Sequence, residues 1–359
     1  MPLKILKSNA LPIGVDLGSG AIKLAQLRLS GHEVELLAAG SAELPRSCRD
    51  SLPDRLHVLA ASIRQIMKSE RFKGRRSILS LPAKDTFLHH VKVPRLAPDQ
   101  IAQTLRLELQ EKLPSDVKDM VIRHVIVGEV SKDQQEVLAL AVSRETLNAY
   151  LAMARKAKLD TISVNVEPLA VVDCFARMLR RAGDASRTML FVDMGATSTQ
   201  VALSHGSKIV FARNLSIGGE QFDQAIAAGM DVPIERAHAL RRDLSMGGAD
   251  SSTEDDLYRL LDEKLDETAA ELAQCLRYYE SVFKNRSVDL TVFVGGQAYD
   301  KHLCRGLAKR LNVPATIGDP LACVKRLVDA GRHAGLDNHA PHPDWAVAIG
   351  LGLGAIRMA

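Results

Sequence analysis

The feature that most constrains the fold of this chain is a motif that occurs twice. Residues 15–23 read Val-Asp-Leu-Gly-Ser-Gly-Ala-Ile-Lys, and residues 192–200 read Val-Asp-Met-Gly-Ala-Thr-Ser-Thr-Gln. Each copy follows a short apolar run and precedes a stretch in which apolar and polar residues alternate, as in a half-buried strand. A second turn, at Ser30-Gly31 or His205-Gly206, then leads to another strand-like run. We therefore expect two related half-molecules whose glycine turns face each other across a cleft.

The residues of these turns are suited to binding phosphate. Glycine allows backbone N–H groups to converge on an anion without a Cβ in the way, and serine and threonine add hydroxyl donors. The first copy also carries Lys23, where the second has Gln200, and one lysine suits one polyphosphate tail. A single Asp-x-Gly is a common hairpin turn, but two matched copies favour a ligand site. The predicted phosphate contacts are Gly18, Ser19, Gly20, Ala21, Lys23, Gly195, Ala196, Thr197 and Ser198.

One aspartate of each motif is a candidate for the metal site. Asp16 and Asp193 stand at the ends of the two predicted strands. Because Mg²⁺ prefers oxygen ligands and keeps several of its waters, we expect these carboxylates to hold a hydrated Mg²⁺ between phosphate oxygens, through water.

The composition is that of an ordinary α/β protein with room for more than one domain. The chain has 359 residues, of which 46% are hydrophobic and 25% charged. Its net charge of +4 is too small to argue for nucleic acid. Basic residues cluster locally at 71–76 and at Arg180-Arg181, which indicates a solvated face or a contact with anionic lipid.

Other features of the sequence indicate a cytoplasmic protein. There is no run of 18 apolar residues, and the N-terminal residues lack the apolar core of a signal peptide. The five cysteines are scattered and form no Cys-x-x-Cys, which is typical of reduced thiols. His89, His90, His205, His333, His339 and His342 have no metal-ligand spacing, so we expect them on the surface.

The pattern of the first half predicts a core interrupted by a small α+β unit. Strands within 12–43 lead to a helix at 52–70 and a strand at 77–81; a strand at 161–166 and a helix at 168–181 return to this core. The intervening residues 83–157 read as strand, helix, strand, strand, helix. Their predicted ranges are 87–93, 98–112, 120–130, 136–142 and 144–157.

The second half adds three signals to its copy of the motif. Gly218 and Gly219 stand between a strand and a helix, where the backbone can approach a ligand. A polar stretch at 241–252 predicts a loop, and 253–285 predicts a long helix. The strand at 290–294 ends in Gly295, Gly296 and Gln297, which we expect to contact a nucleoside.

The order of these pieces resembles the actin-like ATPase superfamily. In that pattern Asp16–Lys23 matches the first phosphate loop, Asp193–Ser198 the second, and Val294-Gly295-Gly296 the adenosine motif. Residues 217–223, with Glu220, are similar to the Gly-Gly-Glu-Asp-Phe-Asp of the 70-kDa heat-shock chaperones. Residues 235–238 resemble their Glu-x-x-Lys, so the resemblance assigns Glu235 and His238 to the adenine and ribose, with histidine in place of lysine.

The resemblance also implies ligands and catalytic candidates. It implies ATP and Mg²⁺ as cofactors, and two duplicated ribonuclease-H-like halves. Asn165-Val166-Glu167-Pro168 falls where the superfamily has its connecting segment, so Glu167 is placed to orient an attacking water, with Asp193 as the second catalytic candidate.

Within the superfamily, three stretches are similar to the PilM family of type IV pilus assembly proteins. They are the strand pair at 13–24, the segment 91–94 with the helix that ends at 108–114, and the residues Ser216-Ile217-Gly218-Gly219, Asp319-Pro320 and 348–352. The inset lies where this family and FtsA carry subdomain 1C. The resemblance implies core subdomain 1A at 1–82 and 158–185, inset 1C at 83–157, core subdomain 2A at 186–235 and 287–359, and helical subdomain 2B at 236–286.

The PilM resemblance implies a scaffold of a type IV pilus, or of a related secretion or competence machine. Such a protein binds the N-terminal cytoplasmic tail of a PilN-like inner-membrane protein in a groove between 1A and the inset. It would thereby sit at the inner membrane through its partner and link the platform to motor ATPases. Strand 87–93 and the helix from Pro98 are the nearest groove candidates, and self-association stays open.

Two other classes of function stay open. A turnover ATPase needs Glu167 or Asp193 near a water in line with the γ-phosphate. A small-molecule kinase needs a substrate pocket with its own carboxylate base, for which the sequence offers no clear candidate.

Overall fold

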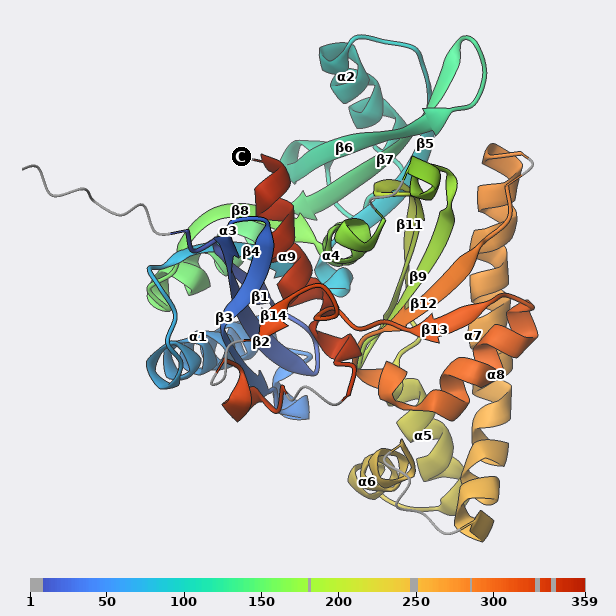
Figure 1. The fold of residues 1–359 in the computed structure, drawn as a ribbon. Helices are drawn as coiled ribbons and strands as arrows, with labels where there is room; N and C mark the ends of the chain where they lie inside the picture. The colour runs from blue at the N-terminus through green and yellow to red at the C-terminus, as the bar shows by residue number, and fades with distance from the viewer. Residues whose placement is uncertain are drawn as a thin grey trace, which may run out of the picture.

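The computed structural model describes residues 9–179, 182–245, 251–284, 286–326, 330–336 and 340–358 (Figure 1). These residues form three sheets whose faces are covered by helices. Their strand orders are β14-β3-β2-β1-β4-β8, β11-β10-β9-β12-β13 and β5-β7-β6. The first two sheets belong to the two halves, and the third belongs to the inset.

The first sheet is built around the strands that flank the first Asp-x-Gly turn. Its strands are β1 (Ile13–Asp16), β2 (Ala21–Ser30), β3 (Glu33–Glu43), β4 (Arg76–Leu81), β8 (Asp160–Val166) and the short β14 (Lys325–Arg326). β1 pairs antiparallel with β2 and parallel with β4. Helix α1 (Leu52–Ser69) begins at Ser51, whose hydroxyl accepts from the Asp54 N–H, and it buries Leu59, Ile63 and Ile66 against the sheet.

The second sheet repeats this arrangement. Its strands are β9 (Thr188–Met194), β10 (Thr199–His205), β11 (Lys208–Leu215), β12 (Leu290–Val294) and β13 (Ala315–Ile317). β9 pairs antiparallel with β10 and parallel with β12, as β1 does with β2 and β4. The predicted duplication is therefore present in the strand pairing. Helices α5 (Gly219–Met230), α6 (Ile234–Ser245), α7 (Ser251–Val282) and α8 (Lys301–Leu311) lie with this half (Figure 1).

Two helices pack against each other between the sheets. These are α4 (Glu167–Phe175), which follows the first half, and α9 (Ala346–Met358), which follows the second. A Cβ on Gly350 would lie 1.9 Å from the Ala170 carbonyl oxygen, so the close crossing depends on glycine there. α4, from the first half of the chain, contacts β10 of the second sheet. α9, from the second half, contacts β1 and β2 of the first sheet. Each helix therefore packs against the sheet of the other half. Trp345 is buried in the same apolar cluster.

The inset has its own sheet and a helix on one face of it. Its elements are β5 (Phe87–Pro94), α2 (Pro98–Glu108), β6 (Met120–Glu129), β7 (Gln134–Ser143) and α3 (Arg144–Lys156). The three strands are antiparallel, and α2 covers one face with Ile101, Leu105 and Leu109. The inset strands also contact β11 of the second half. α3 packs against α1 and places Tyr150 and Met153 in the core of the first half.

The structure differs from the sequence expectation in several places. Helices α2 and α4 end at Glu108 and Phe175, before the predicted ends at 112 and 181, and His342, expected on the surface, is only 6% exposed. Residues 241–245, expected in a loop, end helix α6, because Arg241 and Leu244 are buried against their neighbours. The rest of that expected loop lies partly outside the described residues, as do Arg180, Arg181 and His339. In addition, β14 and α9 lie against the first sheet, although 287–359 was assigned to the second core subdomain. Because α9 packs on the first half, the boundary between the two halves cannot be drawn from sequence order alone.

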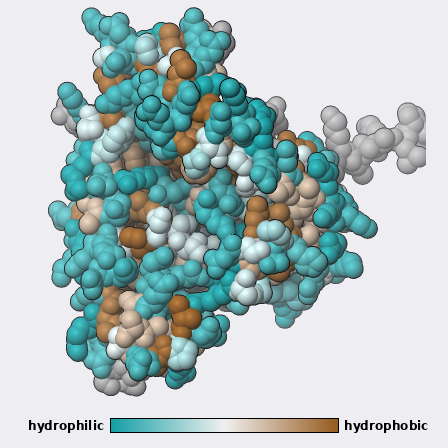
Figure 2. Space-filling model, turned by 180° about the vertical axis from the view of Figure 1, so that it is seen from behind, coloured by the Kyte–Doolittle hydropathy of each residue, from teal (hydrophilic) through white to brown (hydrophobic). Residues whose placement is uncertain are grey.

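None of the described helices is both long and apolar enough to cross a membrane. Figure 2 shows the face opposite to that of Figure 1 as mainly hydrophilic, with hydrophobic residues in several small groups.

Candidate functional site

A cavity of about 920 Å³ lies between the two halves. Its walls come from the first turn, the second turn, the end of β12 and the segment that precedes α9. The residues predicted from the sequence that line it are Asp16, Gly18, Ser19, Gly20, Ala21, Lys23, Glu167, Asp193, Gly195, Ala196, Ser198, His238, Gly295, Gly296 and Gln297. The structure therefore brings most of the predicted site together.

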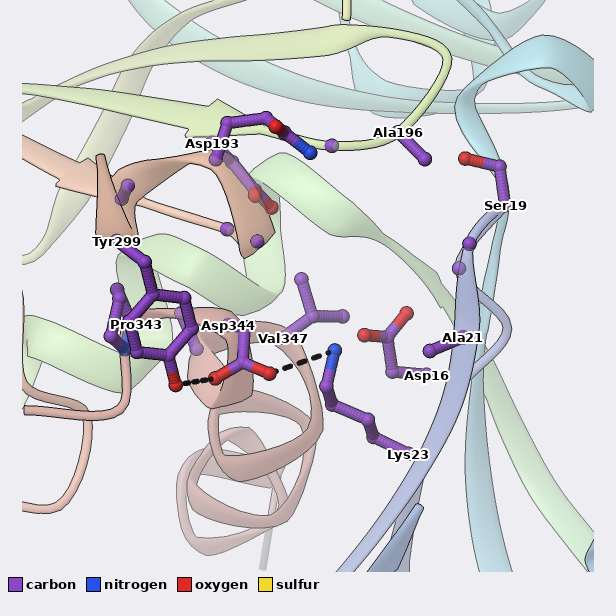
Figure 3. Close-up of a pocket in the computed structure, with 18 of the residues that line it drawn as sticks. Asp16, Ser19, Ala21, Lys23, Asp193, Ala196, Tyr299, Pro343, Asp344 and Val347 are labelled. Carbon is purple, nitrogen blue, oxygen red and sulfur yellow. Dashed lines mark hydrogen bonds and ion pairs between the residues drawn. The ribbon is translucent and has the colours of Figure 1, made fainter. Parts of the chain in front are cut away.

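The two glycine turns face each other at one end of this cavity. A Cβ on Gly20 would lie 3.0 Å from the Cβ of Ala196, so the first turn and the second nearly touch. Figure 3 shows Ser19 and Ala196 on opposite sides of this approach. The second turn is closed by the Gly195 N–H, which donates to the Ser198 carbonyl oxygen at 2.9 Å. A ligand that reaches this point contacts both halves.

Lys23 is held by a carboxylate that the sequence did not single out. Its Nζ lies 3.3 Å from Asp344 Oδ2, and the Tyr299 hydroxyl donates to Asp344 Oδ1 at 2.7 Å (Figure 3). Burial would lower the pKa of the Lys23 ammonium, but Asp344 and Asp16 more than offset this, and the pKa lies above its usual value. Lys23 is therefore a charged, pre-positioned cation at the edge of the cavity.

Three carboxylates are buried near the floor of the cavity. Asp16, Asp193 and Glu167 are only 6%, 9% and 8% exposed. Burial, opposed in part by Lys23, raises the pKa of Asp16 to about 6. Burial and the charge of Asp16 raise the pKa of Asp193 to about 7, and burial with both aspartates raises that of Glu167 well above its usual value. Each carboxylate makes ionisation of the others harder.

This arrangement fits a hydrated divalent cation. Two oxygens on the cavity wall, Glu167 Oε2 and Gln200 Oε1, are buried without a hydrogen-bond partner. A cation would relieve the repulsion between the carboxylates, and its water ligands would satisfy such oxygens. Within the described ranges, no group of three His, Cys, Asp or Glu side chains is placed to hold a metal ion. The charged oxygen donors at this point of the cavity wall are Asp16, Asp193 and Glu167.

A buried arginine holds the first glycine turn through hydrogen bonds to its backbone. Arg55 of α1 is fully buried, and its Nη2 donates to the carbonyl oxygens of Leu17 at 2.7 Å and Gly18 at 3.0 Å. Its charge also lowers the pKa values of Asp16 and Glu167. No pattern in the sequence predicts this role, because Arg55 lies in an amphipathic helix, where an arginine is normally on the solvent face.

The residues at the start of α5 lie behind the second turn and not on the cavity wall. The N–H groups of Gly219 and Glu220 donate to the carbonyl oxygens of Gly195 and Ala196, at 3.0 and 2.8 Å. A Cβ on Gly218 would lie 2.5 Å from the Ser198 nitrogen, so only glycine allows this approach. Gly218, Gly219 and Glu220 are not among the lining residues, and neither is Thr197. The start of α5 therefore holds the second turn in place through these hydrogen bonds.

Two arginines of the first half reach across to α5. Arg46 pairs with Asp223, and Arg49 pairs with Glu220; all four side chains join the segment after β3 to the second half. Asp223 is buried and also accepts from Arg241 Nε at 2.7 Å. We call the Arg46–Asp223 and Arg49–Glu220 pairs the cross-cleft clasp. Its acidic partners lie in the Gly-Gly-Glu segment singled out from the sequence, but nothing in the sequence marked the two arginines.

The wall expected to hold a nucleoside is formed by the end of β12 and by α6. Gly295 has a φ of 86°, and a Cβ there would lie 2.4 Å from Asp193 Oδ1, so this turn requires glycine. Arg241 donates to Gln297, and both residues line the cavity. His238 Nδ1 lies 2.9 Å from Asp223 Oδ2 at the same wall. Glu235 is exposed and is not among the lining residues.

Comparison with known proteins identifies one family and several solved structures with a similar fold. A family model described as "Type IV pilus assembly protein PilM" matches residues 14–356. The "PilM-PilN type IV pilus biogenesis complex" contains a chain with 22% sequence identity and a TM-score of 0.79, and the match covers 96% of this chain and 98% of that one. The ethanolamine utilization protein EutJ from Carboxydothermus hydrogenoformans has 14% identity and a TM-score of 0.57, covering 97% of this chain and 90% of EutJ. The predicted fold class, an actin-like ATPase fold of duplicated halves with an inset, is confirmed.

Proposed function

This chain belongs to the PilM family of type IV pilus assembly proteins, and we propose that it is a scaffold of pilus assembly that binds ATP with Mg²⁺ in the cavity between its halves. The observation that carries the nucleotide proposal is the meeting of two glycine turns above buried Asp16 and Asp193, with Lys23 beside them. Such a site offers backbone N–H groups and one ammonium to an anion, and carboxylates to its cation.

The nucleotide would lie along the cavity with its two ends at different walls. Its phosphates would contact the turns at Gly18–Ala21 and Gly195–Ser198, and its nucleoside would contact Gly295–Gln297 and His238. Asp16 and Asp193 would hold Mg²⁺ through water, and the ion would supply positive charge between the phosphate oxygens. Lys23 would approach the phosphates as a point charge, in competition with Asp344.

We further propose that the partner is the N-terminal cytoplasmic tail of a PilN-like inner-membrane protein. The similar solved structure is a complex of PilM with PilN, and its PilM-like chain aligns over nearly all of this one. The tail would bind between the first core subdomain and the inset. Through this partner the protein would sit at the inner membrane and link the platform to the motor ATPases.

Slow turnover is the expectation for this site. Glu167, the predicted water-orienting residue, is buried, and burial together with the charges of Asp16 and Asp193 raises its pKa well above the usual value. A protonated carboxyl cannot accept a proton from an attacking water. A role for Glu167 and Asp193 in slow hydrolysis stays a prediction.

The test is titration calorimetry of the full chain with Mg-ATP and with adenosine, followed by phosphate release from the bound ATP. We expect Mg-ATP to bind, with slow release or none. Lys23→Ala should lower ATP affinity by roughly tenfold to a hundredfold, the value of one charge-assisted bond, and leave adenosine affinity nearly intact. No binding of Mg-ATP by the folded protein would overturn the nucleotide assignment, and fast, sugar-dependent consumption would indicate a kinase.

A further inference from the structure

One end of the first half carries a group of exposed cations that the proposed functions do not use. The turn between α1 and β4 and the turn between α3 and β8 lie side by side there. The Arg75 carbonyl oxygen accepts from the Asp160 N–H at 2.8 Å, and Arg75 Nη1 donates to the Lys158 carbonyl oxygen at 3.3 Å. The exposed cations of these two turns and of the ends of α1, α3 and β4 beside them, which we call the basic end, are Lys68, Arg71, Lys73, Arg75, Arg76, Arg155, Lys156 and Lys158.

The charges of the basic end are not neutralised by neighbouring acids. Within the described part of the chain, none of these side chains forms an ion pair. The acids nearest in sequence are Asp160, which is exposed, and Glu70, which lies 3.1 Å from His333. The chain as a whole has a net charge of only +4, so the basic end is a local feature.

The turns of the basic end are held in place by the fold. The Gln26 side chain donates to the Lys73 carbonyl oxygen and accepts from the Lys73 N–H, each at 2.7 Å. Phe72 is half-buried and packs against the core of the first half. The cations are therefore presented by an ordered surface, as opposed to a free tail.

We infer that the basic end is a docking surface for an anionic membrane leaflet. Lysine and arginine groups at a membrane surface are attracted to anionic headgroups over roughly a Debye length. The basic end is shared by the first half and by α3 of the inset, the two parts between which the proposed tail would bind. The inference rests here on the proposed function, because a tail that leaves the membrane and ends between these two parts would bring this surface close to the leaflet.

The features of the basic end favour a membrane over nucleic acid. The cavity between the halves and the hollow at Arg95 and residues 129–132 are lined by other residues. The aromatic side chain of these turns, Phe72, packs inward and offers no face for base stacking. A broad surface of unpaired cations suits a layer of headgroups.

The test is co-sedimentation of the full chain with vesicles. One set contains equal parts of phosphatidylglycerol and phosphatidylcholine, and the other contains phosphatidylcholine alone. We expect binding to the anionic set only, and weaker binding at high salt. The triple variant Arg71→Glu, Lys73→Glu, Arg76→Glu should lose at least about tenfold in affinity. The matched control, Arg277→Glu, Arg305→Glu, Lys309→Glu, makes the same charge change on exposed positions of the second half and should bind like wild type.

The outcomes separate this inference from the proposed function. The vesicles carry no partner tail, so their binding does not depend on the PilN proposal, and circular dichroism with thermal unfolding shows that each variant is folded whether or not it binds nucleotide. The inference would be wrong if the wild-type protein did not bind anionic vesicles. It would also be wrong if the triple variant of the basic end and the control variant lost binding equally. A protein that captures a duplex oligonucleotide but leaves the vesicles in solution would contradict it as well.

Discussion

Single residues decide what the cavity between the halves can bind. The sequence identified Asp16 and Asp193 because they occupy matched positions in a repeated turn, and Lys23 because only the first copy has a lysine there; the structure places all three on the cavity wall. Asp344 and Tyr299, which hold Lys23, come from segments without a recognisable pattern. A residue that enters a site through tertiary packing leaves no local signal in the sequence.

The two aspartates should each be needed for metal-dependent binding. We expect Asp16→Ala and Asp193→Ala to weaken Mg-ATP binding by about tenfold to a hundredfold, because each removes a charged anchor of the hydrated ion. Calorimetry with Mg²⁺ and with a chelator measures the effect. The losses should nearly vanish in the chelator, and wild-type affinity in both folded variants would show that Mg²⁺ binds elsewhere.

The buried carboxylates should also make the nucleotide-free protein less stable as pH rises. The pKa values of Asp16 and Asp193 are raised from 3.8 to about 6 and about 7. Between these values the folded state holds more protons than the unfolded state, so the free energy of unfolding falls as pH rises. The favourable contribution is complete below about pH 4 and is lost through pH 6 to 7.

Chemical unfolding in a chelator between pH 5 and 8 measures this effect. Asp193→Asn should remove part of the pH dependence, with a difference of the order of a few kcal/mol between the ends of the range. If the wild-type and variant curves stayed parallel, Asp193 would titrate normally in the folded state.

At the scale of elements, the sequence predicted most of the helices and strands but few of their contacts. The motif copies, the period of α1 and the hairpin β6–β7 each have a local pattern, and each forms as expected. The exchange of α4 and α9 between the halves was not predicted, since it depends on which sheet face each helix covers. The helical end of α6 was missed because a polar run such as Arg241–Ser245 becomes helical only where Arg241 and Leu244 find buried partners.

The cross-cleft clasp should slow nucleotide release. Arg49 pairs with Glu220, whose N–H also donates to the second turn, and Arg46 pairs with Asp223 of the same helix, so opening the cavity requires these pairs to break. We expect Arg46→Ala and Arg49→Ala each to raise the dissociation rate of a fluorescent ATP analogue about tenfold, equivalent to about 1.4 kcal/mol. Stopped-flow displacement by unlabelled ATP measures the rate.

A control for the clasp is the ion pair of Arg95 with Glu129 in the inset. It lies away from the cavity, and both side chains are largely exposed, so it contributes little to stability. Arg95→Ala should release nucleotide at the wild-type rate. Equal acceleration in all three variants would indicate general loosening of the protein.

At the scale of the whole molecule, the inset is less separable than its sequence suggests. Residues 83–157 read as one unit, yet α3 contributes Tyr150 and Met153 to the core of the first half. Tyr150 also donates to Asp85 at 2.6 Å, which ties the two ends of the unit together. Removing all of 83–157 would therefore expose apolar core. Point variants test the proposed docking groove more cleanly than a deletion does.

Two exposed isoleucines, one on the inset and one on the first core subdomain, are candidates for the proposed groove. Ile126 lies on β6, an edge strand of the inset sheet, and is 50% exposed; Ile162 lies on β8, an edge strand of the first sheet, and is 42% exposed. An extended tail binds through apolar anchors and through the free hydrogen-bonding groups of an edge strand. We expect Ile126→Asp and Ile162→Asp to weaken binding of a PilN-type tail peptide at least about tenfold, equivalent to about 1.4 kcal/mol or the loss of one buried apolar contact.

The matched control is Met230→Asp, because Met230 is also 42% exposed but ends α5 in the second half. Fluorescence anisotropy of a labelled tail measures all three variants, and Mg-ATP binding shows that they are folded. Loss of peptide binding in Met230→Asp, with the two isoleucine variants unaffected, would move the partner to the second half. If wild type binds no such peptide, the chain keeps its family and its fold, but its proposed partner is wrong.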